Sequence, residues 1–233
     1  EIVREVHLEF IVAGAEICTL NTYAATPTRL RNSNREDDFE LIHSMADQAV
    51  REAIQNSKLP IKVAGCLPPL HGSYLGTPSR PKSSMADEYA QIVQLHPTVD
   101  LWIIETMTNP HEAEAAVTAG LESGKPVLLA YRLEKNGKLK SGQTLQEVKG
   151  CFDHKDLSGI LINCSEPEII SDHIAELSDF DMPFGAYGNG FVSVEPLARG
   201  ESVFKLQARE DLSPTKYADY VDQWISVGAT IVG

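Results

Sequence analysis

The sequence of 233 residues lacks the features that would assign it to several large classes of protein. No apolar run approaches the roughly 18 residues that a membrane-spanning helix needs, so a membrane is not an expected partner. No run of Lys or Arg is longer than two, and the formal net charge is −13, so nucleic acid is not an expected partner either. No charged segment followed by an apolar stretch opens the chain, which favours a cytoplasmic location.

Cysteine is also scarce. The chain has four cysteines, Cys18, Cys66, Cys151 and Cys164, and none of them stands in a CxxC spacing. This distribution does not predict a disulfide framework; it is typical of reduced cytosolic thiols or of metal ligands. Cys18 in mid-strand and Cys151 at a helix end are expected to be ordinary packing or surface residues.

Short apolar runs alternate along the chain with longer amphipathic segments. The runs are almost continuously Val, Ile, Leu and Ala, which is typical of strands buried on both faces of a parallel sheet. This alternation predicts an α/β fold with a single domain over residues 1–233. The predicted strands are 16–22, 61–67, 101–106, 127–131, 159–164, 184–187 and 230–232.

The segments between these strands carry recognisable helix starts, each a capping side chain followed by a proline or an acidic residue. Two long connections, 72–84 and 188–212, follow strands, and barrels carry their active sites at that end. An open doubly wound sheet is the competitor, but it usually has a Gly-rich fingerprint after its first strand, which this sequence lacks. A (β/α)8 barrel is therefore preferred. The predicted starts are Asn109–Pro110, Thr144 with Glu147, Ser165 with Glu168, and Ser213–Pro214.

Two cysteines stand at predicted strand ends, where a barrel places its reactive groups. Cys164 is followed at once by a predicted helix start, whose dipole would favour a thiolate. Cys66 also ends a strand. For each of them the alternative is a buried, inert thiol.

Glu105 ends the apolar strand Leu-Trp-Ile-Ile-Glu, where a carboxylate is costly to bury without a cationic partner. Its alternative is a solvated residue on the rim. Tyr23, Tyr131 and Tyr187 also fall at strand ends, and they predict either a partial aromatic cage for a cationic group or ordinary packing.

No histidine falls at a predicted strand end. His43, His111, His154 and His173 lie on predicted helices or loops and are expected at the surface. A Ser-His-Asp triad or a histidine-ligated metal is therefore not favoured.

Several segments resemble, in order along the whole chain, the motifs of one enzyme family. They carry a Gly-Ala followed by Asn-Thr-Tyr, a Gly-Cys-Leu-Pro-Pro turn, a Glu-Thr pair with a later Glu-Ala, and an Asn-Cys pair with a later proline. Together they are similar to the homocysteine S-methyltransferases. The segments are 13–24, 64–69 with the loop at 72–74, 105–106 with 112–113, 161–168, and 213–217 with 228–233.

The resemblance implies a (β/α)8 TIM barrel that moves a methyl group from a donor onto the sulfur of homocysteine. It implies Zn2+ held by three cysteines, of which Cys164 matches one. The family's first strand would precede Glu1, and its Cys-Cys pair would follow Gly233. The chain is therefore expected to be incomplete at both ends, without the first strand, and inactive as it stands.

The resemblance also implies substrate contacts. Glu105 matches the ligand of the homocysteine ammonium group, and Asn163 lies beside the zinc cysteine. Tyr23 matches a tyrosine on the donor side, and Thr22 precedes it in the same motif. The expected partners are thus two small molecules, homocysteine and a methyl donor, while the role of Cys66 stays open.

S-methylmethionine is the favoured donor. Glycine betaine comes second, because the rim lacks the tryptophans of a full ammonium cage. A cobalamin-linked enzyme comes third, since the chain contains no cobalamin domain. A Schiff-base aldolase would need a lysine at a strand end, and Lys62 stands at a strand start. A barrel that binds an amino acid without catalysis is the remaining alternative, and it predicts no stoichiometric zinc.

Overall fold

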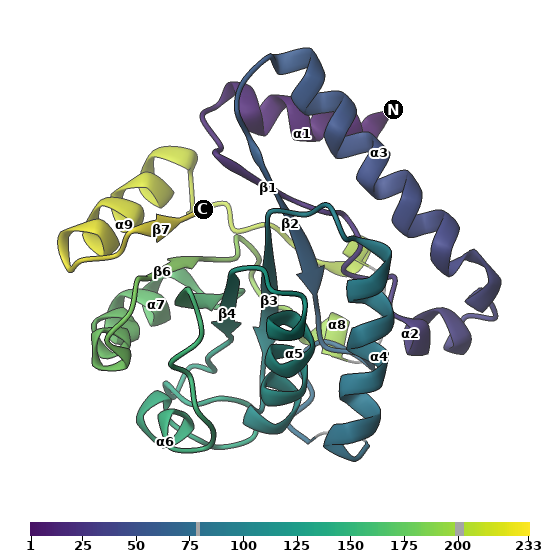
Figure 1. The fold of residues 1–233 in the computed structure, drawn as a ribbon. Helices are drawn as coiled ribbons and strands as arrows, with labels where there is room; N and C mark the ends of the chain where they lie inside the picture. Colours follow the sequence, from purple (N-terminus) through teal and green to yellow (C-terminus); the bar gives the residue numbers. More distant parts are fainter. Residues whose placement is uncertain (78–79, 199–202) are drawn as a thin grey trace.

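The computed structural model describes residues 1–77, 80–198 and 203–233 (Figure 1). Its seven strands form one sheet in the order β1 to β7, and every neighbouring pair is parallel. All seven predicted strands are confirmed, most with slightly shorter bounds. The strands are β1 Ile17–Thr19, β2 Lys62–Leu67, β3 Leu101–Met107, β4 Val127–Tyr131, β5 Gly159–Asn163, β6 Phe184–Tyr187 and β7 Ile231–Val232.

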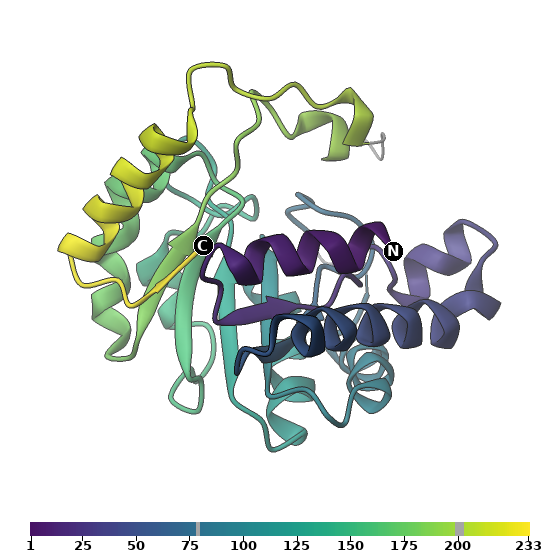
Figure 2. The same cartoon turned by 90° about the horizontal axis from the view of Figure 1, so that it is seen from above.

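The sheet curls into a half-barrel with helices on its outer side (Figures 1 and 2). In the described part of the chain β1 pairs only with β2, and β7 only with β6, so the two edges are not joined to each other. The predicted barrel fold is confirmed in this open form. A parallel sheet in sequential order brings the carboxyl ends of all its strands to one rim, which is where a barrel places its chemistry.

The helices fill the connections between strands. α1 packs against α3, α4 against α5, and α7 against α9. In Figure 2 the segment between β6 and α9 extends away from the sheet and carries α8. The helices are α1 Ile2–Val12, α2 Pro27–Asn32, α3 Phe39–Ser57, α4 Lys82–Leu95, α5 Pro110–Glu122, α6 Leu145–Lys149, α7 Pro167–His173, α8 Glu195–Ala198 and α9 Pro214–Ser226, with short 3-10 turns at Glu36–Asp38, Ile174–Phe180 and Val203–Lys205.

Three of the four predicted helix starts are confirmed. Asn109 and Ser213 accept hydrogen bonds from backbone amides three residues further on, and Thr144 forms a complete capping box. The start at Ser165 is wrong, because α7 begins at Pro167 and its cap residue is Glu166. The Ser165 hydroxyl is buried and instead accepts a hydrogen bond from the backbone amide of Leu133 at 2.9 Å, which ties β5 to the loop after β4.

The apolar side chains form two clusters, one on each face of the sheet. The larger lies between the sheet and the helices and contains both tryptophans, Trp102 and Trp224. The smaller lines the inside of the half-barrel, because successive side chains of a strand point to opposite faces. It forms the floor beneath the strand ends. Its members are Ala64, Leu101, Ile103, Leu128, Ala130 and Leu161.

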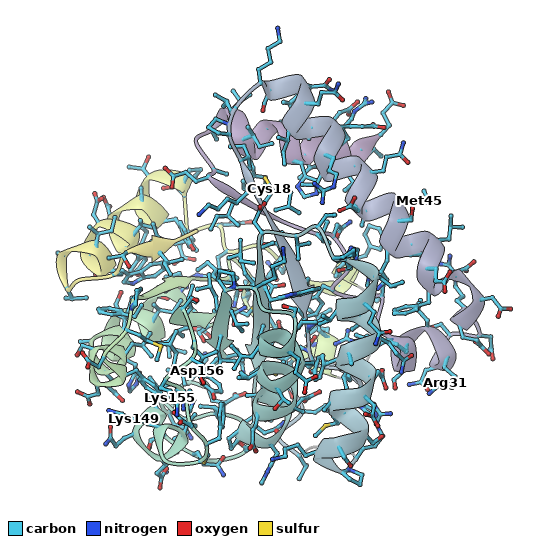
Figure 3. The ribbon with its side chains drawn as sticks, viewed as in Figure 1. Cys18, Arg31, Met45, Lys149, Lys155 and Asp156 are labelled. Carbon is cyan, nitrogen blue, oxygen red and sulfur yellow. The ribbon has the colours of Figure 1, made fainter. Side chains whose placement is uncertain are left out.

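Cys18 and Cys151 are ordinary, as predicted. Cys18 is buried on β1, whereas Cys151 is exposed just after α6 and its thiol bonds the backbone carbonyl of Glu147. Figure 3 labels Cys18 within the body of the molecule and Met45 on the outer side of α3. Among the described residues no helix is both long and apolar enough to span a bilayer.

Candidate active site

The ends of β3 and β5 are joined by a buried pair of side chains. The backbone amide of Thr106 donates to Oδ1 of Asn163 at 2.9 Å, and Nδ2 of Asn163 donates to the Thr106 hydroxyl at 3.0 Å. Both residues are fully buried. The pairing register of β3 with β4 shifts between Ile104 and Met107, so a bulge lies at Glu105 and Thr106. Such bulges often re-aim side chains beside active sites.

Cys164 follows β5 and lies against this pair. The Thr106 hydroxyl donates to its Sγ at 3.3 Å, and Nδ2 of Asn163 lies 3.7 Å from the same sulfur. The backbone amide of Cys164 donates to the carbonyl of Tyr187 at 3.1 Å, which joins β5 to β6. The position of Cys164 is therefore fixed by hydrogen bonds to residues of two other strands, β3 and β6.

The prediction that a helix dipole makes Cys164 a thiolate is wrong for the protein by itself. Burial raises the pKa of this thiol to about 11, although the hydrogen bond from Thr106 acts in the opposite direction. The helix cannot offset this, because α7 begins only at Pro167. At neutral pH Cys164 is a protonated thiol until something else stabilises its charge.

Glu105 projects from the bulge into the cavity with a neutral donor on each carboxylate oxygen. The Tyr187 hydroxyl donates to Oε1 at 2.8 Å, and the Cys66 thiol donates to Oε2 at 3.1 Å. No Lys, Arg or His of the described chain forms an ion pair with it. Burial raises the pKa of the carboxyl, and these two hydrogen bonds oppose the rise. Glu105 is thus half-buried, hydrogen-bonded and without a cation, unlike a solvated rim residue.

Tyr23 lies on another wall of the same cavity. Its hydroxyl and the Ser73 hydroxyl are hydrogen-bonded at 2.8 Å, and the Arg29 guanidinium lies 5.3 Å from the centre of its ring. Arg29 also donates to the carbonyl of Pro69 at 2.7 Å, so it holds the loop after β2 against the loop after β1. Burial is the main cause of the raised pKa of Tyr23, which stays a neutral phenol.

The tyrosines at the site differ from the predicted three. Tyr131 is a packing residue, the second of the two alternatives, because its side chain points outward from β4 into the outer core, and its hydroxyl bonds His154 at 3.4 Å. Tyr74, which strand-end reasoning missed, lies beside Cys164 instead, and burial and that thiol both raise its pKa. Tyr74 has a φ of +70° in the loop after β2, and Arg132 lies 5.0 Å from its ring centre. The sequence signal that could have pointed to Tyr74 was the Gly-Ser pair that precedes it in a long loop.

The remaining two predicted residues lie behind the cavity surface. Asn163 is enclosed between Thr106 and Cys164 and donates hydrogen bonds to both side chains. Thr22 is buried, and its hydroxyl has no hydrogen-bond partner among the described residues. Asn21 lines the cavity in its place, because neighbouring residues present their side chains in different directions.

The cavity has a volume of about 970 Å3 and a mostly apolar lining. Glu105, Tyr23 and Tyr187 lie on its surface, with α1 and β1 along one side and the end of β7 along another.

Two of the four histidines predicted at the surface are buried. His43 of α3 and His96, which follows α4, face each other with 2.7 Å between Nδ1 and Nε2, and His154 packs between Phe152 and Phe180. His43 was misplaced because its helix turns this side chain toward α4. His111 is exposed, as predicted, and His173 is half-buried.

Within residues 1–77, 80–198 and 203–233, no three His, Cys, Asp or Glu side chains are grouped so that they could hold a metal ion. Structural and catalytic zinc sites in proteins use three or four protein ligands. Cys164 is therefore one candidate ligand, and the described residues do not complete a zinc site around it.

Comparison with known proteins decides the family. The model of the homocysteine S-methyltransferase family matches residues 1–233. The chain belongs to this family. It is therefore a methyltransferase of the homocysteine S-methyltransferase type, as the resemblance of its motifs predicted, and membership of this family supports transfer of a methyl group to a thiol or selenol.

Two curated relatives match the chain over its full length. A selenocysteine methyltransferase of Astragalus bisulcatus is 22% identical over 267 residues, and the match covers 77% of that protein. The homocysteine S-methyltransferase of Escherichia coli (strain K12) is 26% identical over 254 residues, and the match covers 79% of it.

Solved structures of the homocysteine methyltransferase MmuM from Escherichia coli share the fold. The metallated form aligns with a TM-score of 0.74 at 21% identity, and the oxidized form with 0.75 at 22%. Each alignment covers 99% of this chain and 78% of the solved one. These values support the half-barrel as part of a TIM-barrel fold.

Proposed function

We propose that this methyltransferase transfers a methyl group from S-methylmethionine to the sulfur of homocysteine, giving methionine, with residues 1–233 forming one homocysteine-binding domain. The observation that carries the proposal is the Glu105 carboxylate, which faces the cavity with neutral donors on both oxygens and no cation among the described residues. A half-buried carboxylate of this kind is stabilised by a cationic ligand group. The ammonium group of an amino acid supplies one.

The proposed position of homocysteine follows from the two strand ends. Its ammonium group binds Glu105 on β3, and its short apolar chain directs its sulfur toward Cys164 after β5. Thr106 connects the two, because it follows Glu105 in sequence and bonds the Cys164 sulfur. Asn163 holds Thr106 in place through two hydrogen bonds. In this arrangement the buried pair of Thr106 and Asn163 connects the carboxylate that binds the ammonium group to the cysteine near the homocysteine sulfur.

The transfer requires a nucleophilic sulfur and a cationic donor. The homocysteine thiolate forms a bond to the donor methyl carbon. The bond from that carbon to the donor sulfur breaks, and its electron pair stays on the donor, which leaves as a neutral thioether. Tyr23 and Tyr74 stand at the proposed donor side, where the electron-rich faces of tyrosine rings attract a sulfonium. A trimethylammonium donor such as glycine betaine is the alternative.

Zinc is part of the proposal only as a binding partner of Cys164. A bound zinc ion would make a thiol acidic enough to ionise at neutral pH, which would offset the burial that raises the pKa of the Cys164 thiol to about 11. The family resemblance implies two further cysteines as the other ligands. The roles proposed for Glu105, Thr106 and Asn163 rest on their hydrogen bonds and do not depend on this metal.

The test is a parallel assay of the full-length protein. Loss of homocysteine thiol and formation of methionine are measured with S-methylmethionine, glycine betaine and S-adenosylmethionine, and zinc is measured by elemental analysis. A selenocysteine acceptor is added as a separate arm, because one relative is named for it. We expect S-methylmethionine to give the highest kcat/KM. Absence of methyl transfer from every donor, in freshly reduced protein, would favour the non-catalytic amino-acid-binding barrel.

A further inference from the structure

We infer that Cys66 is a positioning residue that holds Glu105 toward the homocysteine ammonium group as a neutral thiol, and that it is not a metal ligand. This inference deepens the proposed function and rests on it for the identity of the ligand. The strand-end position of Cys66 is equally compatible with both roles, and its contacts in the structure distinguish them.

The Glu105 carboxylate is held from two sides. Cys66 lies on β2, next to β3 in the sheet, and donates to Oε2 at 3.1 Å. Tyr187 lies on β6 and donates to Oε1 at 2.8 Å. A carboxylate offers about four acceptor positions, so one hydrogen bond on each oxygen orients the group and leaves acceptor capacity on both. The two donors therefore fix the direction of the carboxylate and keep it able to bind an ammonium group.

The surroundings of Cys66 keep its sulfur protonated. Its side chain is 1% exposed, and burial raises the pKa of the thiol well above its ordinary value. Glu105 raises it further, because a thiolate beside the carboxylate would bring two negative charges within hydrogen-bonding distance. A protonated thiol that donates to the carboxylate brings no second negative charge. A metal-bound Cys66 would have to give up this hydrogen bond and leave Oε2 with no donor from the described chain.

Cys164 differs from Cys66 in the groups around its sulfur. Its sulfur accepts hydrogen bonds from Thr106 and Asn163, which suits a sulfur that is to carry negative charge. Cys66 instead donates to the Glu105 carboxylate, which already carries a negative charge. The two thiols at the same rim therefore have opposite hydrogen-bonding roles, and a metal titration can separate them.

The experiment compares Cys66→Ala and Cys66→Ser with the wild type and with Cys151→Ala, a remote exposed control. Homocysteine affinity is measured by calorimetry, KM for homocysteine and for S-methylmethionine by initial rates, and zinc by elemental analysis. We expect Cys66→Ala to raise the homocysteine Kd and KM about tenfold, the loss expected for one hydrogen bond to a charged group. The donor KM should stay within twofold, and Cys66→Ser should recover most of the affinity because its hydroxyl is also a donor.

Zinc content should remain at the wild-type level in both Cys66 variants. Loss of zinc in both would overturn the inference and assign Cys66 as a ligand. An unchanged homocysteine affinity in Cys66→Ala would overturn it as well. Circular dichroism excludes a folding defect as the cause. If the wild type binds homocysteine but methylates it with no donor, the proposed function fails, while the calorimetric comparison still decides the role of Cys66.

Discussion

Thr106 and Cys164 have left-handed backbone angles, with φ of +59° and +50°. Non-glycine residues adopt this region at a cost of about 1–3 kcal/mol each, and they persist where the surroundings hold them. Here each is held by the other, since the Thr106 hydroxyl bonds the Cys164 sulfur and Asn163 bonds both. Such residues cluster at functional sites, and these two lie in contact at the ends of different strands.

The charge of Glu105 is the feature on which amino-acid binding depends in the proposed function. Glu105→Gln keeps the size of the side chain but removes its negative charge, so the homocysteine ammonium group loses its partner. We expect KM for homocysteine to rise roughly a hundredfold, the upper range for hydrogen bonds between charged groups, while KM for the donor stays near its original value. Initial-rate kinetics with each substrate varied in turn provide the measurement.

Glu105→Asp serves as the matched control, because it restores the charge at a slightly greater distance and should recover part of the affinity. A change of less than twofold in the homocysteine KM of Glu105→Gln would contradict the assignment of this carboxylate.

Individual residues also show what the sequence could and could not predict. The position of Glu105 and Cys164 at the rim could be predicted because each ends an apolar run, and parallel strands bring such ends to one rim. For Tyr131 the same rule left a cage and ordinary packing as alternatives, since the rule does not say to which face of the sheet a side chain points. Tyr74 was missed because it lies in a loop. The bond between Cys66 and Glu105 depends on strand register and on a bulge, which no apolar pattern encodes.

At the scale of elements, long-range polar contacts hold helices and loops in place. Arg209 forms two hydrogen bonds to Glu168 of α7, at 2.7 and 2.8 Å, and two to Asp211, at 2.7 and 3.1 Å. Tyr220 of α9 bonds the same Glu168 at 2.8 Å. This group anchors the end of the long connection after β6 between two helices. The apolar pattern predicted the helices themselves, but these pairings join residues far apart in sequence and had no local signal.

The buried histidine pair ties α3 to the end of α4 in a pH-dependent way. His43 Nε2 donates to the carbonyl of Ala25 at 2.9 Å, so its Nδ1 accepts from His96 Nε2, and both rings are neutral. Burial, reinforced by His43, lowers the pKa of His96 to about 4 from 6.5. The unfolded chain therefore binds this proton first as the pH falls. Stability is complete above pH 6.5, declines below it, and levels off near pH 4.

We expect this pair to lower the free energy of unfolding by about 2 kcal/mol as the pH falls from 6.5 to 5. Denaturant unfolding at several pH values measures it, with the wild type compared with His96→Gln so that carboxylate effects cancel. The variant should show a shallower decline with falling pH. His111→Gln, at an exposed position on α5, should decline like the wild type, and equal slopes in all three proteins would refute the prediction.

At the scale of the whole molecule, the side chains that stabilise the fold are separate from those that form the site. The two apolar clusters hold the half-barrel from outside and from inside, and both lie below the rim that carries Cys164 and Glu105. The order and direction of all seven strands followed from the alternation of apolar runs and helices, since this pattern reflects the whole core. The rim depends on a few polar contacts, so it can change without loss of the fold.

This separation predicts the outcome of Cys164→Ala in the full-length protein. We expect the variant to lose bound zinc and methyl transfer while keeping the circular dichroism spectrum of the wild type, because the substitution leaves both apolar clusters intact. A ligand that binds only the folded state stabilises it by its binding free energy, so the loss of zinc alone should lower Tm. The variant should therefore melt close to wild type stripped with a chelator, and Cys151→Ala should melt like untreated wild type. Full zinc occupancy in Cys164→Ala would show that Cys164 is not a zinc ligand. Loss of the helical circular dichroism spectrum would show that the rim is needed for the barrel to fold.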